Sequence, residues 1–321
     1  MIQVKPQSLA RHSAPTEILV KMASSAYPIF FNSYIFRSNP PHNRLAHALR
    51  RGSSEGHTLA WYNQRMPVPS PAPLELVRAL EERALNAWPA HQTVFHRGWV
   101  FRLSAGYTKR GNSANALEPD APFDGVLAAA RSVYSRHGLP AVFRISPLAP
   151  AAADSELAAA GYVEFDPSVV LHRPLDKGAL GAPDAALQLA ASPSDLWLEG
   201  FAVGTQMPPH HRALHRRTLE TIAQPCAYAL LLEQGRAAGF GLAVLERDAV
   251  GLYDLAVTPS ARGQGHGRAL VQGLLHWAAQ AGATSAYLQV RAQNAAALRL
   301  YQDLGFAPAY HYHYRVPPQA F

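Results

Sequence analysis

The stretch LYDLAVTPSARGQGHG, Leu252 to Gly267, decides the fold of this chain. An apolar run ends at Val257, a proline-containing turn follows, and a glycine-rich bend leads into a predicted helix over 265–281. Glycines let a backbone approach a ligand closely, and the first amides of a helix point outward in a field that favours anions. The bend therefore predicts an anion site built from Gly263, Gly265 and Gly267, with Arg262 and Arg268 as cationic donors.

Two common phosphate-binding motifs do not fit this bend. A phosphate loop of the form GxxxxGK[ST] is absent, and a dinucleotide fingerprint GxGxxG would need a glycine where Arg268 stands. Two readings remain from these residues alone. The bend either holds another phosphate ligand or is only a tight connection between a strand and a helix.

A second motif, NAAALRLYQDLGF at 294–306, favours the ligand. Asn294 and Tyr301 are seven positions apart and share one face of a predicted helix, and the small Ala297 near that face leaves room. Together with V-x-P-x-x-R-G-Q-G-H-G-R-A-L at 257–270, this motif resembles the GNAT superfamily of acyl-CoA-dependent N-acetyltransferases. The detailed match covers about the last 70 residues, and the order of predicted elements extends it back to about Leu187.

The resemblance implies that the chain moves an acetyl group from acetyl-CoA directly to a primary amine, without an acyl-enzyme. The strand before the bend would pair with the pantetheine arm, and the Val257 amide would polarise the thioester carbonyl. The bend amides would hold the pyrophosphate, Asn294 would bind pantetheine, and Tyr301 would protonate the leaving thiolate. The implied cofactor-binding residues are Leu255, Ala256, Val257, Arg262, Gly263, Gln264, Gly265, His266, Gly267, Arg268, Asn294, Ala297 and Tyr301, and no metal is implied.

The base and the acceptor site keep several readings open. Asp254 lies where many family members carry an acid on this strand; it either deprotonates the amine through water or is a structural carboxylate. Tyr253 alternates to the other strand face and suits packing as well as substrate contact. A terminal strand pair is expected around 310–316, and in this family it often borders the acceptor. Its residues either pack or line the amine pocket, through Tyr310, Tyr312 and Tyr314 or through His311 and His313.

The remaining pattern alternates helices and strands, which predicts an α/β class with one mixed sheet. Helices are expected over 74–87, 123–137, 154–160, 196–203, 208–222, 265–281 and 294–304. Strands are expected over 92–106, 141–146, 162–171 (interrupted near Pro167), 187–191, 227–233, 237–246, 250–257 and 286–290.

The first half repeats the cadence of the second. The segment AVFRISP…ELAAAGYVEFDP parallels AYLQVRA…RLYQDLGFAPAY, but it lacks both the RGxGxG bend and the Asn…Tyr pair. We therefore expect a tandem GNAT arrangement whose N-terminal copy is degenerate, does not hold CoA, and covers the catalytic sheet or shapes the acceptor pocket. The polar segment YTKRGNS, 107–113, either faces that pocket or is a solvated loop. The predicted domains are a partner at 66–175, a linker at 176–184 rich in Pro and Gly, and a catalytic domain at 185–321.

Charge separates the first 65 residues from the rest. Residues 1–65 hold eight Lys/Arg against two acids, whereas the remainder is nearly balanced, so the net charge of +7 belongs to this leader. Without a sustained period it is expected to be disordered, and either a transit peptide or a dispensable extension before Met66. Nucleic-acid binding would then be a property of the leader, and we do not expect it.

Composition excludes several classes. One cysteine among 321 residues, Cys226, rules out a disulfide framework and a Cys-rich zinc module, and no apolar run is long enough to span a bilayer. His211 and His215 are four apart, but Arg212 stands where a zinc protease has Glu. We expect a cytoplasmic enzyme, as a monomer or homodimer, that acts on a small amine or a peptide. The alternatives are a non-catalytic acyl-CoA sensor and a protein N-terminal acetyltransferase.

Overall fold

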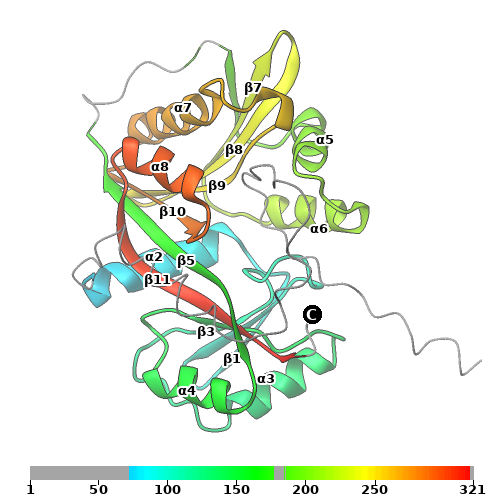
Figure 1. The fold of residues 1–321 in the computed structure, drawn as a ribbon, viewed down its shortest axis with the longest axis vertical. Helices are drawn as coiled ribbons and strands as arrows, with labels where there is room; N and C mark the ends of the chain where they lie inside the picture. Colours follow the sequence, from blue (N-terminus) through cyan, green and yellow to red (C-terminus); the bar gives the residue numbers. More distant parts are fainter. Residues whose placement is uncertain (1–71, 177–183, 185, 319–321) are drawn as a thin grey trace, which may run out of the picture. The chain divides into compact units, whose positions relative to one another are not determined.

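The computed structural model describes residues 72–176, 184 and 186–318, and these build one mixed sheet with helices on its faces (Figure 1). The strands are β1 (Gln92–His96), β2 (Trp99–Leu103), β3 (Ala114–Ala116), β4 (Phe143–Ile145), β5 (Val163–Pro174), β6 (Leu187–Ala190), β7 (Cys226–Glu233), β8 (Arg236–Glu246), β9 (Ala249–Val257), β10 (Ser285–Arg291) and β11 (Ala307–Val316). Their order is β1-β2-β3-β4-β11-β5-β10-β9-β8-β7-β6. The predicted class, α/β with one mixed sheet, is confirmed.

The helices begin and end close to their predicted positions because their caps are readable. For example, Ser194 accepts a hydrogen bond from the Trp197 amide at the start of one helix, and Asn294 does the same for the Ala297 amide. The helices are α2 (Leu74–Ala87), α3 (Val126–Ser135), α4 (Ala151–Ala159), α5 (Asp195–Gly204), α6 (Pro209–Glu220), α7 (His266–Gln280) and α8 (Ala295–Asp303), with a short 3₁₀ turn, η2, at Pro259–Ala261.

The two halves of the chain exchange their last strands. β5 ends the first half, yet it lies between β10 and β11 of the second. β11 ends the second half, yet it lies between β5 and β4 of the first. The two long strands run antiparallel side by side through the middle of the sheet (Figure 1). The sheet is therefore continuous across both halves.

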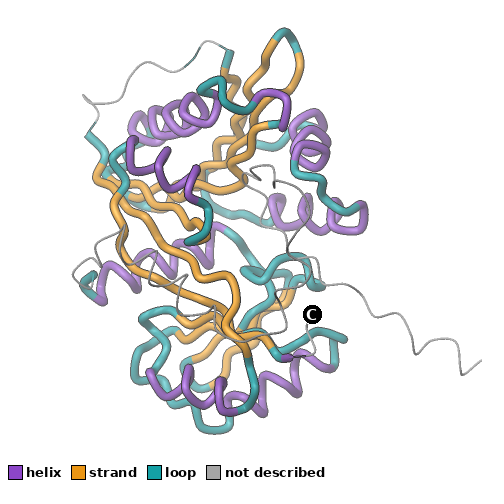
Figure 2. The backbone as a smooth tube through the Cα atoms, viewed as in Figure 1, coloured by secondary structure: helices purple, strands orange, loops and turns teal. Residues whose placement is uncertain are grey.

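Helices lie on both sides of this sheet (Figure 2). On one face, α7 and α8 pack against β7 to β10 around Leu252, Leu270 and Leu274. On the opposite face, α2, α5 and α6 pack over the same strands around Trp88, Trp197 and other aromatic side chains. A third core lies under α3 and α4 in the first half. Helix α2 of the first half therefore helps to cover the strands of the second.

Three predicted strands need correction. The expected strand 92–106 is a hairpin of β1 and β2, turned at Arg97 and Gly98, whose φ angles of 50° and 79° suit a two-residue turn. Pro167 does not interrupt β5, which continues to Pro174, because the pairing with β11 shifts register nearby and accommodates it. The expected terminal pair is a single strand, β11, within the described residues. The short strand β3 had no prediction.

Several expectations concern residues outside the described ranges. The leader at 1–65 and its junction at Met66 lie there, as does most of the linker at 176–184. The domain boundaries at 66–175 and 185–321 stay a prediction. What the structure adds is that the strands on either side of the linker belong to the same sheet.

Gly200 in α5 should reverse the usual effect of a glycine-to-alanine change in a helix. Alanine is normally better by about 1 kcal/mol. Here an added Cβ would lie 2.6 Å from Cζ of Phe240, a fully buried ring. Because overpacking costs about 1–3 kcal/mol, we expect Gly200→Ala to lower the free energy of unfolding in urea. Adding Phe240→Leu should recover part of the loss relative to the sum of the two single changes. A stabilised Gly200→Ala variant would contradict this packing.

Candidate active site

The pairing between strands β9 and β10 ends part-way along both strands. Their parallel pairing runs from Ala249–Ser285 to Leu252–Leu288 and ends there, although β9 continues to Val257 and β10 to Arg291. On its other edge, β9 stays paired with β8 up to Val257. The last residues of β9 therefore present one backbone edge to the opening between the two strands. Leu255, Ala256 and Val257 lie on this stretch of β9, beyond the last pair with β10, and their contact with a pantetheine arm stays a prediction.

A bulge in β9 begins this opening. The register with β8 shifts between Phe240 and Leu242, and Asp254 has a left-handed φ of 46°. Such a conformation is uncommon for residues other than glycine, with Asp and Asn the best tolerated. The bulge turns the strand and changes which way the following side chains point.

The glycine bend follows directly and ends in an uncapped helix. Gly263 and Gly265 have φ values of 80° and 86°, and an added Cβ at either one would meet no atom within 4 Å. Gly265 is the N-cap of α7 and has no side chain to satisfy the first amides of the helix. The bend is thus an open backbone surface with amide donors at a positive helix end, which suits a phosphate.

The charged side chains around the bend are held by neighbours. Arg262 donates from Nε to the Val257 carbonyl at 3.4 Å. Arg268 reaches Asp303 of α8 at 3.3 Å, and His266 lies 3.4 Å from Glu233. Gln264 donates to the Ser260 carbonyl at 3.5 Å. Of the amides at 264–268 that the sequence predicted as donors to a pyrophosphate, that of Arg268 donates to the Gly265 carbonyl at 2.9 Å, so the role of this set stays a prediction.

Tyr301 lies on helix α8. Asn294 caps the helix through Oδ1, at 3.2 Å from the Ala297 amide. Tyr301, two turns on, is 3% exposed and packs against Phe306 and residues of α7. Burial raises the pKa of its phenol above the ordinary value of 10. The hydroxyl is therefore a proton donor at neutral pH, as an acid for a leaving thiolate must be.

Asp254 has a partner that the sequence analysis did not pair with it. Its Oδ2 lies 2.7 Å from Nε2 of His215, which comes from α6 and is 1% exposed. From the sequence, His215 is a candidate only for a metal site with His211. The sequence carries no local signal for this pair, because the two residues are 39 positions apart and meet only where α6 crosses β9.

Aromatic rings enclose the histidine. The centroids of Phe201, Tyr107 and Trp197 lie 5.0, 5.8 and 6.0 Å from that of His215, and Trp88 lies at 6.3 Å. Tyr107 and Trp88 belong to the first half of the chain and the others to the second. Both halves therefore shape the surroundings of the dyad, and the enclosed setting strengthens its electrostatic interaction.

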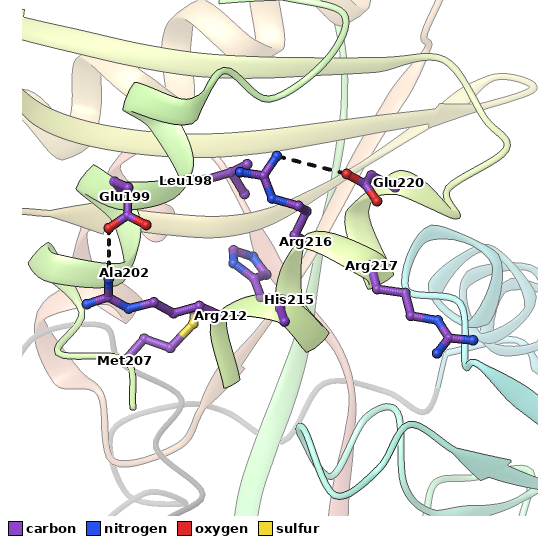
Figure 3. A pocket seen from close by; sticks show the side chains of 10 residues that line it. Leu198, Glu199, Ala202, Met207, Arg212, His215, Arg216, Arg217 and Glu220 are labelled. Atoms are coloured by element: carbon purple, nitrogen blue, oxygen red, sulfur yellow. Dashed lines mark hydrogen bonds and ion pairs between the residues drawn. The ribbon is translucent and has the colours of Figure 1, made fainter. Parts of the chain in front are cut away.

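His215 also lines a cavity of about 220 Å³ between α5 and α6 (Figure 3). Charged side chains surround the opening: Arg212 pairs with Glu199 at 2.8 Å, and Arg216 pairs with Glu220 at 4.0 Å. Leu198 and Met207 form the apolar part of the lining. The cavity leads from solvent-exposed charges to the buried dyad and is large enough for a small amine or a short side chain.

The predicted acceptor residues divide between two faces of β11. The hydroxyls of Tyr310 and Tyr312 are committed to Glu81 at 2.5 Å and Gln289 at 3.2 Å. With Tyr314, they share the aromatic core of α2 and α5, on the same sheet face as the dyad. His313 instead pairs with Asp154 of α4 at 2.8 Å, and His311 is exposed. Of the two alternatives, the tyrosine face is the one on the dyad's side.

Tyr253 is a packing residue in this structure. Its hydroxyl lies 2.9 Å from that of Tyr287, and burial raises its pKa to about 12. The ring packs beside Trp88 at 6.2 Å. Contact between Tyr253 and an acceptor stays a prediction.

Most of the described chain matches a known protein family. Residues 75–316 match the family described as the C-terminal region of the probable histone acetyltransferase Rv0428c. The chain belongs to this family. As an Rv0428c-type acetyltransferase it is 27% identical over 243 residues to the uncharacterized N-acetyltransferase YobR of Bacillus subtilis, covering 75% of this chain and 98% of that protein. It is also 39% identical over 79 residues to the ribosomal protein bS18-alanine N-acetyltransferase of Escherichia coli, covering 25% of this chain and 53% of that protein.

Solved structures place the Rv0428c-type chain in the GNAT fold. A GCN5-related N-acetyltransferase from Kribbella flavida matches with a TM-score of 0.56 at 18% identity, covering 75% of this chain and 94% of that one. A tandem GNAT protein from the clavulanic acid biosynthesis pathway matches with a TM-score of 0.52 at 12% identity, covering 82% and 95%. The protein is thus an acyltransferase of GNAT type, and the resemblance seen in the sequence is confirmed.

The described residues of the Rv0428c-type chain contain neither a metal-binding group of side chains nor a membrane-spanning helix. In the part of the chain that the structure describes, no group of three or more His, Cys, Asp or Glu side chains could hold a metal ion. Within the same residues, no helix is both long and apolar enough to cross a bilayer.

Proposed function

We propose that this protein transfers the acetyl group of acetyl-CoA to a primary amine by direct attack, with the opening between β9 and β10 as the donor site. One observation carries the proposal. The strands part immediately before a glycine bend that opens α7, so an unpaired strand edge and unpartnered helix amides lie in sequence along one track. A pantetheine arm hydrogen-bonds like a strand and ends in phosphates, which is the chemistry that this track offers.

The residues of the chain divide the work along that track. The bend amides from Gln264 to Arg268 would hold the diphosphate, and the edge of Leu255 to Val257 would hold the pantetheine amides. The Val257 N–H would hydrogen-bond the thioester carbonyl and stabilise charge there as the amine attacks. Tyr301 would donate its phenolic proton to the departing sulfur. These assignments extend the family pattern residue by residue.

The dyad would receive the proton of the amine. Asp254 lies at the bulge of β9, directly before the strand edge that would hold the thioester. Its carboxylate lies 2.7 Å from Nε2 of His215. A carboxylate attracts a protonated amine and, through the imidazole or a water, accepts the proton lost before attack. Since Asp254 supplies the charge and His215 the orientation, the pair combines the two readings left open for Asp254 alone.

Release of CoA thiol with a panel of amines tests the proposal. Free amino acids, polyamines, aminoglycosides and short peptides should be compared at saturating acetyl-CoA, with calorimetry of CoA binding in parallel. Thiol release that depends on an amine supports the transferase. CoA binding without release from any amine would indicate an acyl-CoA sensor, and no heat with millimolar CoA or acetyl-CoA would overturn the donor site.

A protein N-terminus is the second candidate acceptor. The bS18-alanine N-acetyltransferase of Escherichia coli is 39% identical over 79 residues of this chain. A match of that length cannot include the whole proposed acceptor side, which α2, α5, α6 and β11 would build. Peptides with free and blocked N-termini in the same panel separate this candidate from a small amine.

The rate should not fall at alkaline pH. Burial raises the pKa of Tyr301 above 10, and an acid works only while protonated. Its protonated form is lost only as pH rises through that raised pKa, so kcat should show no alkaline decline up to about pH 9.5. The measurement is kcat at saturating substrates across this range. A decline that begins below pH 9 and disappears in Tyr301→Phe would show that the phenol titrates earlier.

A further inference from the structure

The segment 107–113 of the first half carries an arginine into the acceptor side of the second. This segment is held in place by its own hydrogen bonds. Asn112 Oδ1 accepts from the amides of Ser104 and Gly106 at 2.7 and 3.0 Å, and Thr108 Oγ1 accepts from the Gly111 amide at 3.2 Å. Arg110, near its tip, is therefore presented by a rigid turn.

Two aromatic rings lie beside the Arg110 guanidinium. Its Cζ lies 5.4 Å from the ring centroid of Trp88 and 5.5 Å from that of Tyr253, and the two centroids are 6.2 Å apart. Both rings are thus in cation–π range of the guanidinium. Tyr253 directly precedes Asp254, so the guanidinium and the catalytic carboxylate border the same short stretch of β9.

Arg110 has no ion-pair partner among the described residues, unlike its neighbours Lys109 and Arg144. Lys109 contacts Asp166 at 2.7 Å, and Arg144 pairs with Glu81. The Arg110 Nε is buried without a hydrogen-bond partner in the part of the chain that the structure describes, while the side chain as a whole is half-buried. An unsatisfied buried donor is costly, and a ligand can supply its acceptor.

The guanidinium nevertheless keeps its charge. Burial lowers the pKa of Arg110, but the hydroxyls of Tyr312, Tyr314 and Tyr253 and the carboxylate of Asp254 raise it by more. The site thus holds a permanent cation and a carboxylate dyad on either side of Tyr253. A ligand that matches both must carry a negative group for one and an amine for the other.

We propose that Arg110 binds a carboxylate of the acceptor, so that the substrate is an amine which also carries a carboxylate, as an amino acid does. This assignment rests on the proposed function and names its substrate class. The planar fork of Arg110 would take both carboxylate oxygens, with Trp88 and Tyr253 in cation–π contact beside it. The amine would then face Asp254 and His215.

Matched acceptor pairs test the assignment. Each amino acid is compared with its carboxamide, for example alanine with alaninamide and lysine with lysinamide, by thiol release. For the natural chain we expect kcat/KM to favour the carboxylate, and Arg110→Gln to lower that preference by about 10- to 100-fold, the value of a charge-assisted hydrogen bond. Because the same pairs are used with both proteins, differences in amine basicity cancel. Arg136→Gln, an exposed change on α3's C-terminal side, is the control.

Further arms separate the possible outcomes. Arg110→Lys keeps the charge but loses the fork, so it should retain part of the preference, and it covers the case in which Arg110→Gln fails to fold. Calorimetry with the N-acetylated product, which retains the carboxylate, should show binding to the natural chain that Arg110→Gln loses. Peptides with an acidic second residue offer a side-chain carboxylate near the amine but no free α-carboxylate on the first residue. Thiol release with these peptides therefore shows whether a side-chain carboxylate can replace that of a free amino acid.

The inference and the proposed function can fail separately. No thiol release with any amine would remove the transferase assignment itself. Transfer to amines with an unchanged carboxylate preference in Arg110→Gln and Arg110→Lys would overturn the Arg110 subsite alone and leave the donor site in place.

Discussion

Replacing Tyr301 by phenylalanine is expected to lower kcat by about 100-fold or more, while the Kd for acetyl-CoA changes little. Phenylalanine keeps the buried ring and its packing against Phe306. Only the hydroxyl is lost, and with it the proton for the leaving thiolate. The rate is measured at saturating acetyl-CoA and amine, and the affinity by calorimetry with CoA.

Tyr162→Phe is the matched control for this change. Tyr162 is also a buried tyrosine, and its hydroxyl accepts a hydrogen bond from Arg131 in the first half, at 3.3 Å and far along the chain from the donor motifs. It should leave turnover unchanged. If Tyr301→Phe also turned over normally, the protein would need another acid and the role of α8 would be reduced to binding.

The second large effect is expected at the dyad. Asp254→Asn should lower kcat/KM by about 100- to 1,000-fold, because the charge that draws in the amine and takes up its proton is lost. Asparagine suits this test. Among non-glycine residues it best tolerates the left-handed φ of 46°, so the bulge is kept. The carboxylate alone is removed.

His215→Gln and the double variant complete the test. If His215 acts by holding Asp254, the double variant should lose little more than Asp254→Asn alone, since residues that act as a unit are not additive. Asp124→Asn, which breaks an exposed pair with Arg97 in the first half, is the control. A full loss that simply adds across both sites would speak against a dyad.

Much of the second half could be predicted from local pattern. The bend, the seven-residue spacing of Asn294 and Tyr301, and the alternation of helix and strand are all short-range signals. The structure confirms the strands and helices that carry them, while the roles of these residues stay a prediction. The hairpin of β1 and β2 was missed because its turn, Arg97-Gly98, uses a non-glycine residue at positive φ. An Asn-Gly pair would have been recognised there.

Long-range partners were beyond the sequence. Asp254 and His215 were both singled out, but nothing local says that α6 crosses the bulge of β9. Arg110 belonged to a segment that could equally be a solvated loop, and only the stacking of Trp88 and Tyr253 on its guanidinium distinguishes it. For the same reason the alternation of β11 predicts two faces without saying which of them meets the dyad.

The exchange of β5 and β11 has a consequence for how this protein can be divided. If a protease cut the chain between Pro174 and Leu187, each fragment would still hold a strand that the other needs to complete its own sheet. The fragments should stay associated and elute together, and neither should be obtained as a well-behaved module when expressed alone. In evolutionary terms, the second half could not be replaced by another domain unless the first half was replaced with it.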